Sequence, residues 1–342
     1  MKTQFNLAAF ALLFTCILHP STSNAQGSLT PPGAPAPTMK TLAQMEPRVP
    51  ISTAPFTIAQ PGSYYLTTNL MAGKNNVITI TTNNVMLDLN GFTIASSPGV
   101  TGYFGIYISS DLRNITIKNG FIRGGVTNDG HGNFSGPGFG SGISCSATQN
   151  VLVSGISVSG CRDFGISVGV YSGGLVQDCQ VHSVGVIGIV AETIRGCVAM
   201  DCGGSAFWGQ QVSDSHGQSV HSEAIRATTA HNCAGMSSEN DGLRVDTAQN
   251  CYGASASSGY GLYASKFALN CSGVSASGTG LFAFNAQNCY GESQSGPRGL
   301  YAQNAAFCVG FRTGGRAIEA TIANGCWAAA GTNLITYKYN MP

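Results

Sequence analysis

The chain has 342 residues, of which only 9% are charged, 43% are hydrophobic and 46 are glycine. Its 16 basic and 15 acidic side chains nearly balance, and removal of a leader containing Lys2 leaves 16 − 1 = 15 basic residues against 15 acidic ones. Because binding to a phosphate backbone needs a surplus of basic side chains, this balance argues against nucleic acid as a partner.

The first residues, MKTQFNLAAFALLFTCILHPSTSNAQG, have the organisation of a secretory signal peptide. Lys2 precedes an apolar stretch over residues 7–18, and Ser23, Asn24 and Ala25 supply a small-residue cleavage site. We therefore interpret residues 1–25 as a signal peptide and expect a protein that is secreted, periplasmic or at the cell surface. No later stretch reaches the ~20 apolar residues that cross a bilayer, so the sequence predicts no transmembrane segment.

A Pro-rich segment, GSLTPPGAPAPT, follows the leader. Its prolines and small residues cannot form a core, which is typical of an extended tether. We interpret residues 26–50 as this tether together with the segment that leads into the folded domain. Residues 51–342 are then predicted to form one domain, and we expect a monomer.

From residue 189 onward the sequence repeats with a short, nearly constant period through eight units. The apolar residues that mark the units are Ile189, Phe207, Ile225, Leu243, Leu262, Leu281, Leu300 and Ile318. Within each unit, a residue whose type varies stands between two small or apolar residues, as Tyr263 does between Leu262 and Ala264. This alternation predicts short strands with one face toward the interior. A unit of this size cannot bury its own apolar side, so the units are predicted to stack as a parallel β-solenoid.

Cysteine recurs eight or nine residues after most of these apolar positions. The column contains Cys197, Cys233, Cys251, Cys271, Cys289, Cys308 and Cys326. Cysteine is a small, nearly apolar residue that suits a narrow interior, and directly stacked cysteines have poor disulfide geometry. Ser215 stands in the same column, so we expect free thiols there, with Cys197–Cys202 and Cys145–Cys161 as the pairs that could bridge.

Asparagine precedes the cysteines at Asn232, Asn250, Asn270 and Asn288. Stacked amides can form hydrogen bonds along such a column, as asparagine ladders do in stacked sheets. We therefore interpret these asparagines as structural.

Three upstream segments, QPGSYYLTTNL, NNVMLDLNGFTI and RNITIKNGFIRG, together with the later Gly-Ile…Asn-Cys units, resemble secreted bacterial right-handed parallel β-helix proteins of the pectate-lyase-like superfamily. The resemblance covers about residues 40–330 and implies architecture and export. It implies no single activity, because the superfamily includes polysaccharide lyases, glycosidases and adhesins.

A left-handed helix would need an aliphatic residue every six positions, whereas the intervals here are eight and ten. The predicted fold is therefore an all-β, right-handed parallel β-helix, with short coils of roughly 18–20 residues in its C-terminal half.

Large planar side chains occupy the outward position after six of the marker residues. This outward stripe consists of Trp208, Arg226, Arg244, Tyr263, Phe282 and Tyr301. Aromatic rings suit sugars and arginine suits the carboxylates of uronic acids, so the stripe is a candidate polysaccharide-binding surface. The alternative interpretation is structural: β-strands favour aromatic residues, and flat side chains that cover the strand face would give the same pattern without binding a ligand.

Two neighbouring units carry carboxylates, Glu223 in HSEAIR and Asp241 in ENDGLRVD. One coil apart, they could face each other near the ~5 Å separation of paired glycosidase carboxylates, as acid and base, or hold Ca²⁺ through oxygen ligands. The pair could equally be a solvated turn whose charges are neutralised by Arg226 and Arg244. No cofactor is required by the sequence, and no closely spaced metal-ligand set occurs in it.

The sequence is compatible with two functions. The first is an exported β-solenoid that binds polysaccharide through the outward stripe, and the second is a polysaccharide lyase or glycoside hydrolase that acts on a uronate-containing glycan. The longest irregular stretch, residues 124–142, is a second candidate location, because Asp129 and His131 could line a cleft there.

Overall fold

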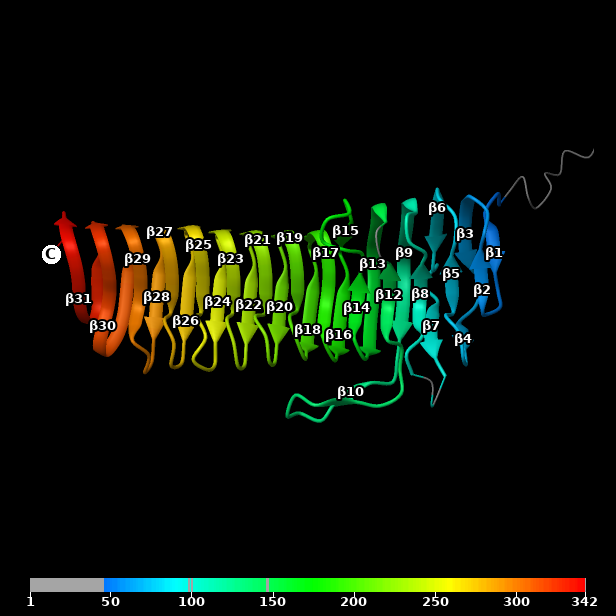
Figure 1. Cartoon of the computed structure of the whole chain (residues 1–342), viewed down its shortest axis with the longest axis horizontal. Helices are drawn as coiled ribbons and strands as arrows, with labels where there is room; N and C mark the ends of the chain where they lie inside the picture. The colour runs from blue at the N-terminus through cyan, green and yellow to red at the C-terminus, as the bar shows by residue number, and fades with distance from the viewer. Residues whose placement is uncertain (1–45, 98, 100, 146–147, 342) are drawn as a thin grey trace, which may run out of the picture. The chain divides into compact units, whose positions relative to one another are not determined.

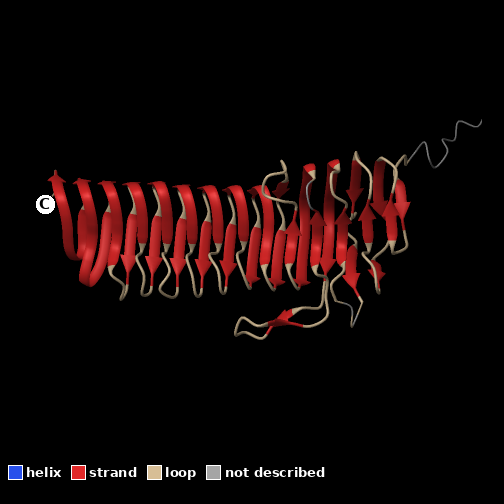
Figure 2. Cartoon of the chain, in the orientation of Figure 1, coloured by secondary structure: helices blue, strands red, loops and turns tan. Residues whose placement is uncertain are grey.

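The structure is a computed structural model of the chain that describes residues 46–97, 99, 101–145 and 148–341. The expected signal peptide, residues 1–25, and most of the expected tether lie outside the described residues. The chain divides into two units, Met1–Pro47 and Arg48–Pro342, and the strands of the described residues lie in the second. None of the described residues lies in a helix, so none forms a helix long and apolar enough to cross a membrane (Figure 2).

The strands follow one another along the second unit (Figure 1). Its first part contains β1 (Val49–Ile51), β2 (Phe56–Ile58), β3 (Gly62–Leu66), β4 (Leu70–Ala72), β5 (Ile78–Ile80), β6 (Val85–Asp88), β7 (Thr93–Ser96), β8 (Phe104–Ile108) and β9 (Arg113–Arg123). Its middle contains β10 (Thr127–Asn128), β11 (Phe134–Ser135), β12 (Ser141–Cys145), β13 (Gln149–Cys161), β14 (Phe164–Ser167), β15 (Leu175–Gln177), β16 (Gln180–Val184), β17 (Ile187–Arg195) and β18 (Val198–Cys202). The C-terminal coils contain β19 (Phe207–Ser213), β20 (His216–Ser219), β21 (Ile225–His231), β22 (Ala234–Ser237), β23 (Leu243–Gln249), β24 (Tyr252–Ser255), β25 (Leu262–Leu269), β26 (Ser272–Ser275), β27 (Leu281–Gln287), β28 (Tyr290–Ser293), β29 (Arg298–Ala306), β30 (Val309–Asn324) and β31 (Trp327–Tyr339).

Each coil pairs in parallel with the next, and the pairing confirms the predicted parallel β-helix. Thr229 of β21 pairs with Thr247 of β23, and Thr247 pairs in turn with Phe267 of β25. The solenoid has about 15 turns, with coils of about 19 residues. Coils are longer upstream, where Ile115 of β9 pairs directly with Val151 of β13.

The interior narrows toward the C-terminus. Isoleucine, leucine and valine fill the early coils, whereas most later coils contribute one leucine or isoleucine together with alanine and cysteine. The narrowing explains Gly253, because a Cβ added there would overlap the carbonyl oxygen of Gly261 on the opposite side of the coil. The backbone at residue 253 lies so close to the backbone at Gly261 that only glycine, which has no Cβ, fits at this position.

The cysteine column lies inside the solenoid as predicted. All eleven cysteines of the described residues are buried and unpaired, which confirms the expected free thiols and excludes the two candidate bridges from this structure. Sγ of Cys251 lies 3.2 Å from the carbonyl oxygen of Gln249, and Cys271 and Leu269 repeat this contact. Burial raises the pKa of the Cys161 thiol to about 12, so it stays protonated at neutral pH.

The asparagine column forms the predicted hydrogen-bonded ladder at a sharp corner of each coil. Asn250 donates from Nδ2 to Oδ1 of Asn232 (3.1 Å), and Asn232 donates to Oδ1 of Asp214 (3.1 Å). Asn270 and Asn288 continue the same direction of donation. These residues have φ near +50°, a left-handed conformation that asparagine tolerates better than most residues, so the corner itself explains why asparagine recurs.

A hairpin built from β10 and β11 projects from the coil and runs alongside the coils that follow (Figure 1). Asn128, in the strand pair next to its turn, donates to Oδ1 of Asp201 (2.5 Å), and the carbonyl oxygen of Gly132 in the turn lies 3.2 Å from Nε2 of His221. The hairpin therefore contacts coils up to 89 residues further along the chain.

Candidate functional site

The outward stripe is a continuous column in the structure. Each member pairs in register with the next: Trp208 with Arg226, Arg226 with Arg244, Arg244 with Tyr263, Tyr263 with Phe282, and Phe282 with Tyr301. The six positions therefore lie on neighbouring strands, β19 to β29, about 4.8 Å apart.

Three aromatic members of the stripe, Tyr263, Phe282 and Tyr301, are stacked on one another. Tyr263 and Phe282 have ring centroids 4.7 Å apart and an interplanar angle of 8°, and Phe282 and Tyr301 are 5.0 Å apart at 13°. Tyr260 packs at an angle against the first pair. Because the ring faces cover each other, a ligand on this surface would meet ring edges and phenol hydroxyl groups.

The arginines of the stripe also lie over its rings. The guanidinium carbon of Arg226 is 5.6 Å from the centroid of the Trp208 ring, and that of Arg244 is 4.8 Å from the Tyr263 ring. Such cation–π contacts hold the guanidinium planes in place. Both arginine side chains remain open to solvent, 58% and 45% exposed.

Asp241 orients Arg244. Its Oδ2 lies 2.7 Å from Nε of Arg244, and its Oδ1 accepts the backbone N–H of Tyr260 at 2.7 Å. The side chain is 2% exposed, and burial raises the pKa of Asp241 above its usual range, with a smaller contribution from the charge of Glu223. Both carboxylate oxygens are thus engaged by donors of the protein itself.

Glu223 occupies the same position one coil earlier. Ile225 pairs with Leu243, so Glu223 and Asp241, each two residues before, match each other on neighbouring coils. Oε1 of Glu223 lies 3.5 Å from Nη1 of Arg226, and the Glu223 side chain is 12% exposed. The structure therefore places each predicted carboxylate with the arginine of its own coil.

The stripe extends past Tyr301 to residues that sequence reasoning missed. Glu319 pairs with Tyr301 in register and binds Arg298 (2.5 Å) and Arg316 (2.7 Å), while Arg298 lies over the Tyr301 ring. Burial opposes the ionisation of Glu319, but the hydrogen bonds from both arginines outweigh it and lower its pKa. The outward stripe is defined by the position directly after the apolar residue that marks each repeat unit. Tyr301 follows Leu300 and Glu319 follows Ile318, so the same spacing could have identified Glu319.

His221 and Glu239 lie beside the carboxylates and connect this region to the hairpin. Nδ1 of His221 is 2.9 Å from Oε2 of Glu239, and Nε2 faces the carbonyl of Gly132. The hydrogen bond with Glu239, followed by that with Gly132, raises the pKa of His221. The hairpin tip thus lies close to the coils that carry Glu223 and Asp241.

The two candidate residues of the hairpin, Asp129 and His131, have local partners. Asp129 accepts the backbone N–H groups of His131 (2.7 Å) and Asn133 (3.2 Å), and the His131 side chain is 86% exposed. These contacts close the hairpin turn. Within the described ranges, no group of three or more His, Cys, Asp and Glu side chains is placed to hold a metal ion.

Comparison with known proteins identifies the fold. No family model and no curated protein matches the sequence. The A-module of mannuronan C-5 epimerase AlgE4 from Azotobacter vinelandii is similar in structure, with a TM-score of 0.52 and 10% identity over 82% of this chain and 89% of that one. Alginate lyase from Paenibacillus sp. strain FPU-7 (TM-score 0.34, 10% identity, 84% and 100%) and polygalacturonase from Erwinia carotovora ssp. carotovora (0.32, 12%, 82% and 88%) match with lower scores.

At these identities the likeness concerns the fold alone. The chain has the parallel β-helix architecture of pectate-lyase-like proteins, as its sequence resemblance predicted.

Proposed function

We propose that this protein is an exported β-helix that binds an acidic extracellular or cell-envelope polysaccharide through the outward stripe. The supporting observation is the pair of solvent-open guanidinium groups of Arg226 and Arg244, each held over an aromatic ring and contacted by a carboxylate beneath it. Rigidly held guanidinium groups lose little side-chain entropy when they bind a carboxylate, and their planar shape matches it.

The chemistry of the stripe favours a uronate polymer over a neutral one. The faces of the stacked rings are covered by neighbours, so stacking on sugars contributes little. Four arginines, Arg226, Arg244, Arg298 and Arg316, stand against the three carboxylates that they contact, Glu223, Asp241 and Glu319, which leaves an excess of one positive charge (4 − 3 = 1). The similar module from A. vinelandii is named for mannuronan, which is a polymer of this class. The proposal rests on the arginines, because that likeness concerns the fold.

Binding can be tested by retention of the purified protein on immobilised polymannuronate and polygalacturonate. We expect retention that Arg226→Ala and Arg244→Ala each reduce. A matched control is Arg113→Ala, an arginine on a different strand ladder. Equal retention of the control and the two stripe variants would contradict the proposal.

A second candidate function is cleavage of such a polymer by Glu223 and Asp241 as acid and base. It is favoured by their matching positions on neighbouring coils and by the raised pKa of Asp241, which is the property of a general acid. The engagement of both Asp241 oxygens favours an orienting role for that residue instead.

Glu223→Gln and Asp241→Asn separate these possibilities when turnover and thermal stability are measured together. Loss of turnover by orders of magnitude with unchanged stability supports catalysis. Loss of stability without any measurable turnover in the unmodified protein assigns the carboxylates to the positioning of Arg226 and Arg244.

A further inference from the structure

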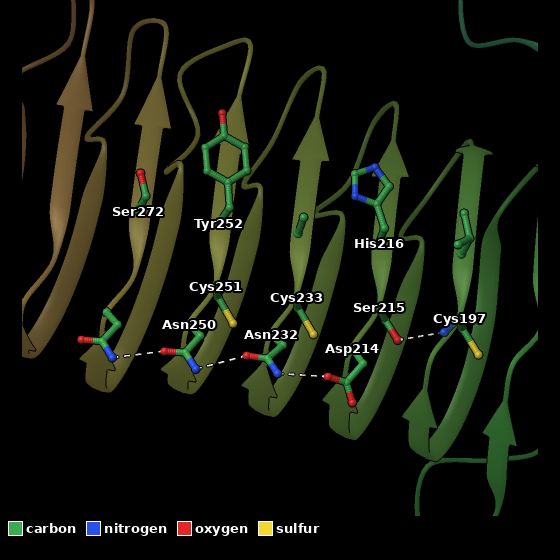
Figure 3. A pocket seen from close by; sticks show the side chains of 13 residues that line it. Cys197, Asp214, Ser215, His216, Asn232, Cys233, Asn250, Cys251, Tyr252 and Ser272 are labelled. Carbon is green, nitrogen blue, oxygen red and sulfur yellow. Dashed lines mark hydrogen bonds between the residues drawn. The ribbon is translucent and has the colours of Figure 1, made fainter.

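A shallow groove of about 620 Å³ runs along the asparagine ladder, on strands β18 to β26 (Figure 3). Its lining includes Asp214, His216, Asn232, Ala234, Asn250 and Tyr252. None of the residues that line it belongs to the outward stripe, so this is a separate surface.

The ring of Tyr252 is presented differently from the rings of the stripe. Tyr252 pairs in register with Ala234 on one side and Ser272 on the other, so no neighbouring ring stacks on it from the adjacent strands. Figure 3, which looks into the groove, shows the phenol ring face-on. The residue is 40% exposed, and its open ring face suits the apolar C–H face of a sugar.

His216 lies on the other side of Ala234 from Tyr252, and Figure 3 also shows its ring face-on. Two strand spacings, roughly 9.6 Å, separate the two residues along the solenoid. The small Ala234 side chain lies between them, so no bulky side chain separates the two rings.

The amide ladder supplies polar groups along the same groove. Each interior amide, such as that of Asn232, uses one N–H group to donate to its predecessor and accepts one bond from its successor. An amide has two N–H groups and two acceptor lone pairs, so a second donor and a second acceptor remain for a ligand. Hydroxyl groups, which both donate and accept, match such a row.

The charge of the groove indicates which sugars it accepts. Among the described residues, no lysine or arginine lines it, and the one carboxylate of the lining, Asp214, has Nε of Arg195 at 4.0 Å from Oδ2. A uronate would therefore find no lysine or arginine among the residues that line the groove. From these features we infer that the groove binds a neutral oligosaccharide, with a sugar ring on Tyr252 and its hydroxyl groups on Asn232 and Asn250.

The inference goes beyond the proposed function and does not depend on it. Isothermal titration of the purified protein with cellohexaose, maltohexaose and mannohexaose tests it, with hexamannuronate and decaproline as comparison probes. We expect at least one neutral hexasaccharide to bind. Tyr252→Ala should lower its affinity about tenfold or more, equivalent to about 1.4 kcal/mol.

Ala234→Phe should lower the same affinity, because a phenylalanine ring beside Tyr252 would compete with the sugar for the open face of the Tyr252 ring. Tyr171→Ala, which removes an exposed tyrosine outside both the groove and the stripe, is the matched control and should leave neutral-sugar binding unchanged. Melting temperatures near that of the unmodified protein establish that each variant is folded.

Three results would overturn the inference: no binding of any neutral hexasaccharide, binding that Tyr252→Ala leaves unchanged, or tighter binding of decaproline that depends on Tyr252. Binding of hexamannuronate that is lost in Arg226→Ala and Arg244→Ala would occur at the stripe and would say nothing about the groove. Failure of the stripe therefore remains distinguishable from failure of the groove.

Discussion

Tyr263 and Phe282 stack face to face across neighbouring coils, with ring centroids 4.7 Å apart and ring planes 8° from parallel. Phe282 stacks on Tyr301 in the same way, so these three rings of the outward stripe cover each other's faces. What the stripe offers to a ligand is its arginines, and Arg244 is itself fixed by Asp241 and by the Tyr263 ring.

The narrow interior predicts a large cost for a single added methyl group. Gly273→Ala should destabilise the protein by about 3 kcal/mol, because the new Cβ would overlap the carbonyl oxygen of Gly280 and neither backbone can move without shifting its neighbours. Urea unfolding measures the difference. Gly73→Ala, where a Cβ has no atom within 4 Å, is the control and should unfold near the midpoint of the unmodified protein.

The asparagine corner predicts that two substitutions of one residue differ. Asn250→Ala loses the ladder hydrogen bonds and also forces alanine into a left-handed conformation at φ +53°, at a cost of about 1–2 kcal/mol for the backbone alone. Asn250→Gly loses the same hydrogen bonds without that backbone cost. Thermal unfolding should therefore find the alanine variant less stable, and equal stability of the two would show that the conformation is not what selects asparagine.

The buried thiols predict slow modification of the folded protein. Burial raises the pKa of Cys145 to about 11 and that of Cys161 to about 12, so neither provides much thiolate at neutral pH. A thiol reagent should label few cysteines before unfolding and all eleven of the described region afterwards. Native mass spectrometry that found Cys251 bridged to Cys271 would contradict this packing.

His221 predicts a pH dependence for the docking of the hairpin. Its pKa is raised above 6.5, first by Glu239 and then by the carbonyl of Gly132, so the folded state binds the proton more tightly than the unfolded state does. Only the part of this shift that the Gly132 carbonyl causes belongs to the hairpin, so its contribution to docking is present while His221 is protonated and is lost as the pH rises through the raised pKa.

Hydrogen exchange of residues 128–134, corrected for the intrinsic rate, should accordingly be slower at pH 6 than at pH 8. His221→Gln should remove this difference, since glutamine does not titrate. An unchanged pH dependence in that variant would contradict this role of His221.

The features that depend on the length of the repeat and on the size of its side chains could be predicted from the sequence. The spacing from Leu243 to Leu262 to Leu281 determines which residues stack, and it correctly placed the cysteines inside and the asparagines in a ladder. Alternation of inward and outward residues is a local property, so it can be read from the chain.

Side-chain orientation and long-range docking could not be predicted in this way. The identity of Phe282 does not reveal whether its ring faces Tyr301 or solvent, because rotamers depend on neighbours in three dimensions. Likewise, no local pattern connects Gly132 with His221, 89 residues away. The open face of Tyr252 became apparent only once its two small neighbours, Ala234 and Ser272, were known.

The most direct test of the central claim is the salt dependence of binding to hexamannuronate, measured by titration at about 20 mM and about 200 mM salt. Exposed guanidinium–carboxylate contacts are screened over about 10 Å at ordinary ionic strength, so affinity should fall steeply for the unmodified protein. In the Arg226→Ala/Arg244→Ala double variant the affinity should be lower and its salt dependence shallower. Equal affinity and equal salt dependence of the two proteins would contradict the claim that the outward stripe binds acidic polysaccharide.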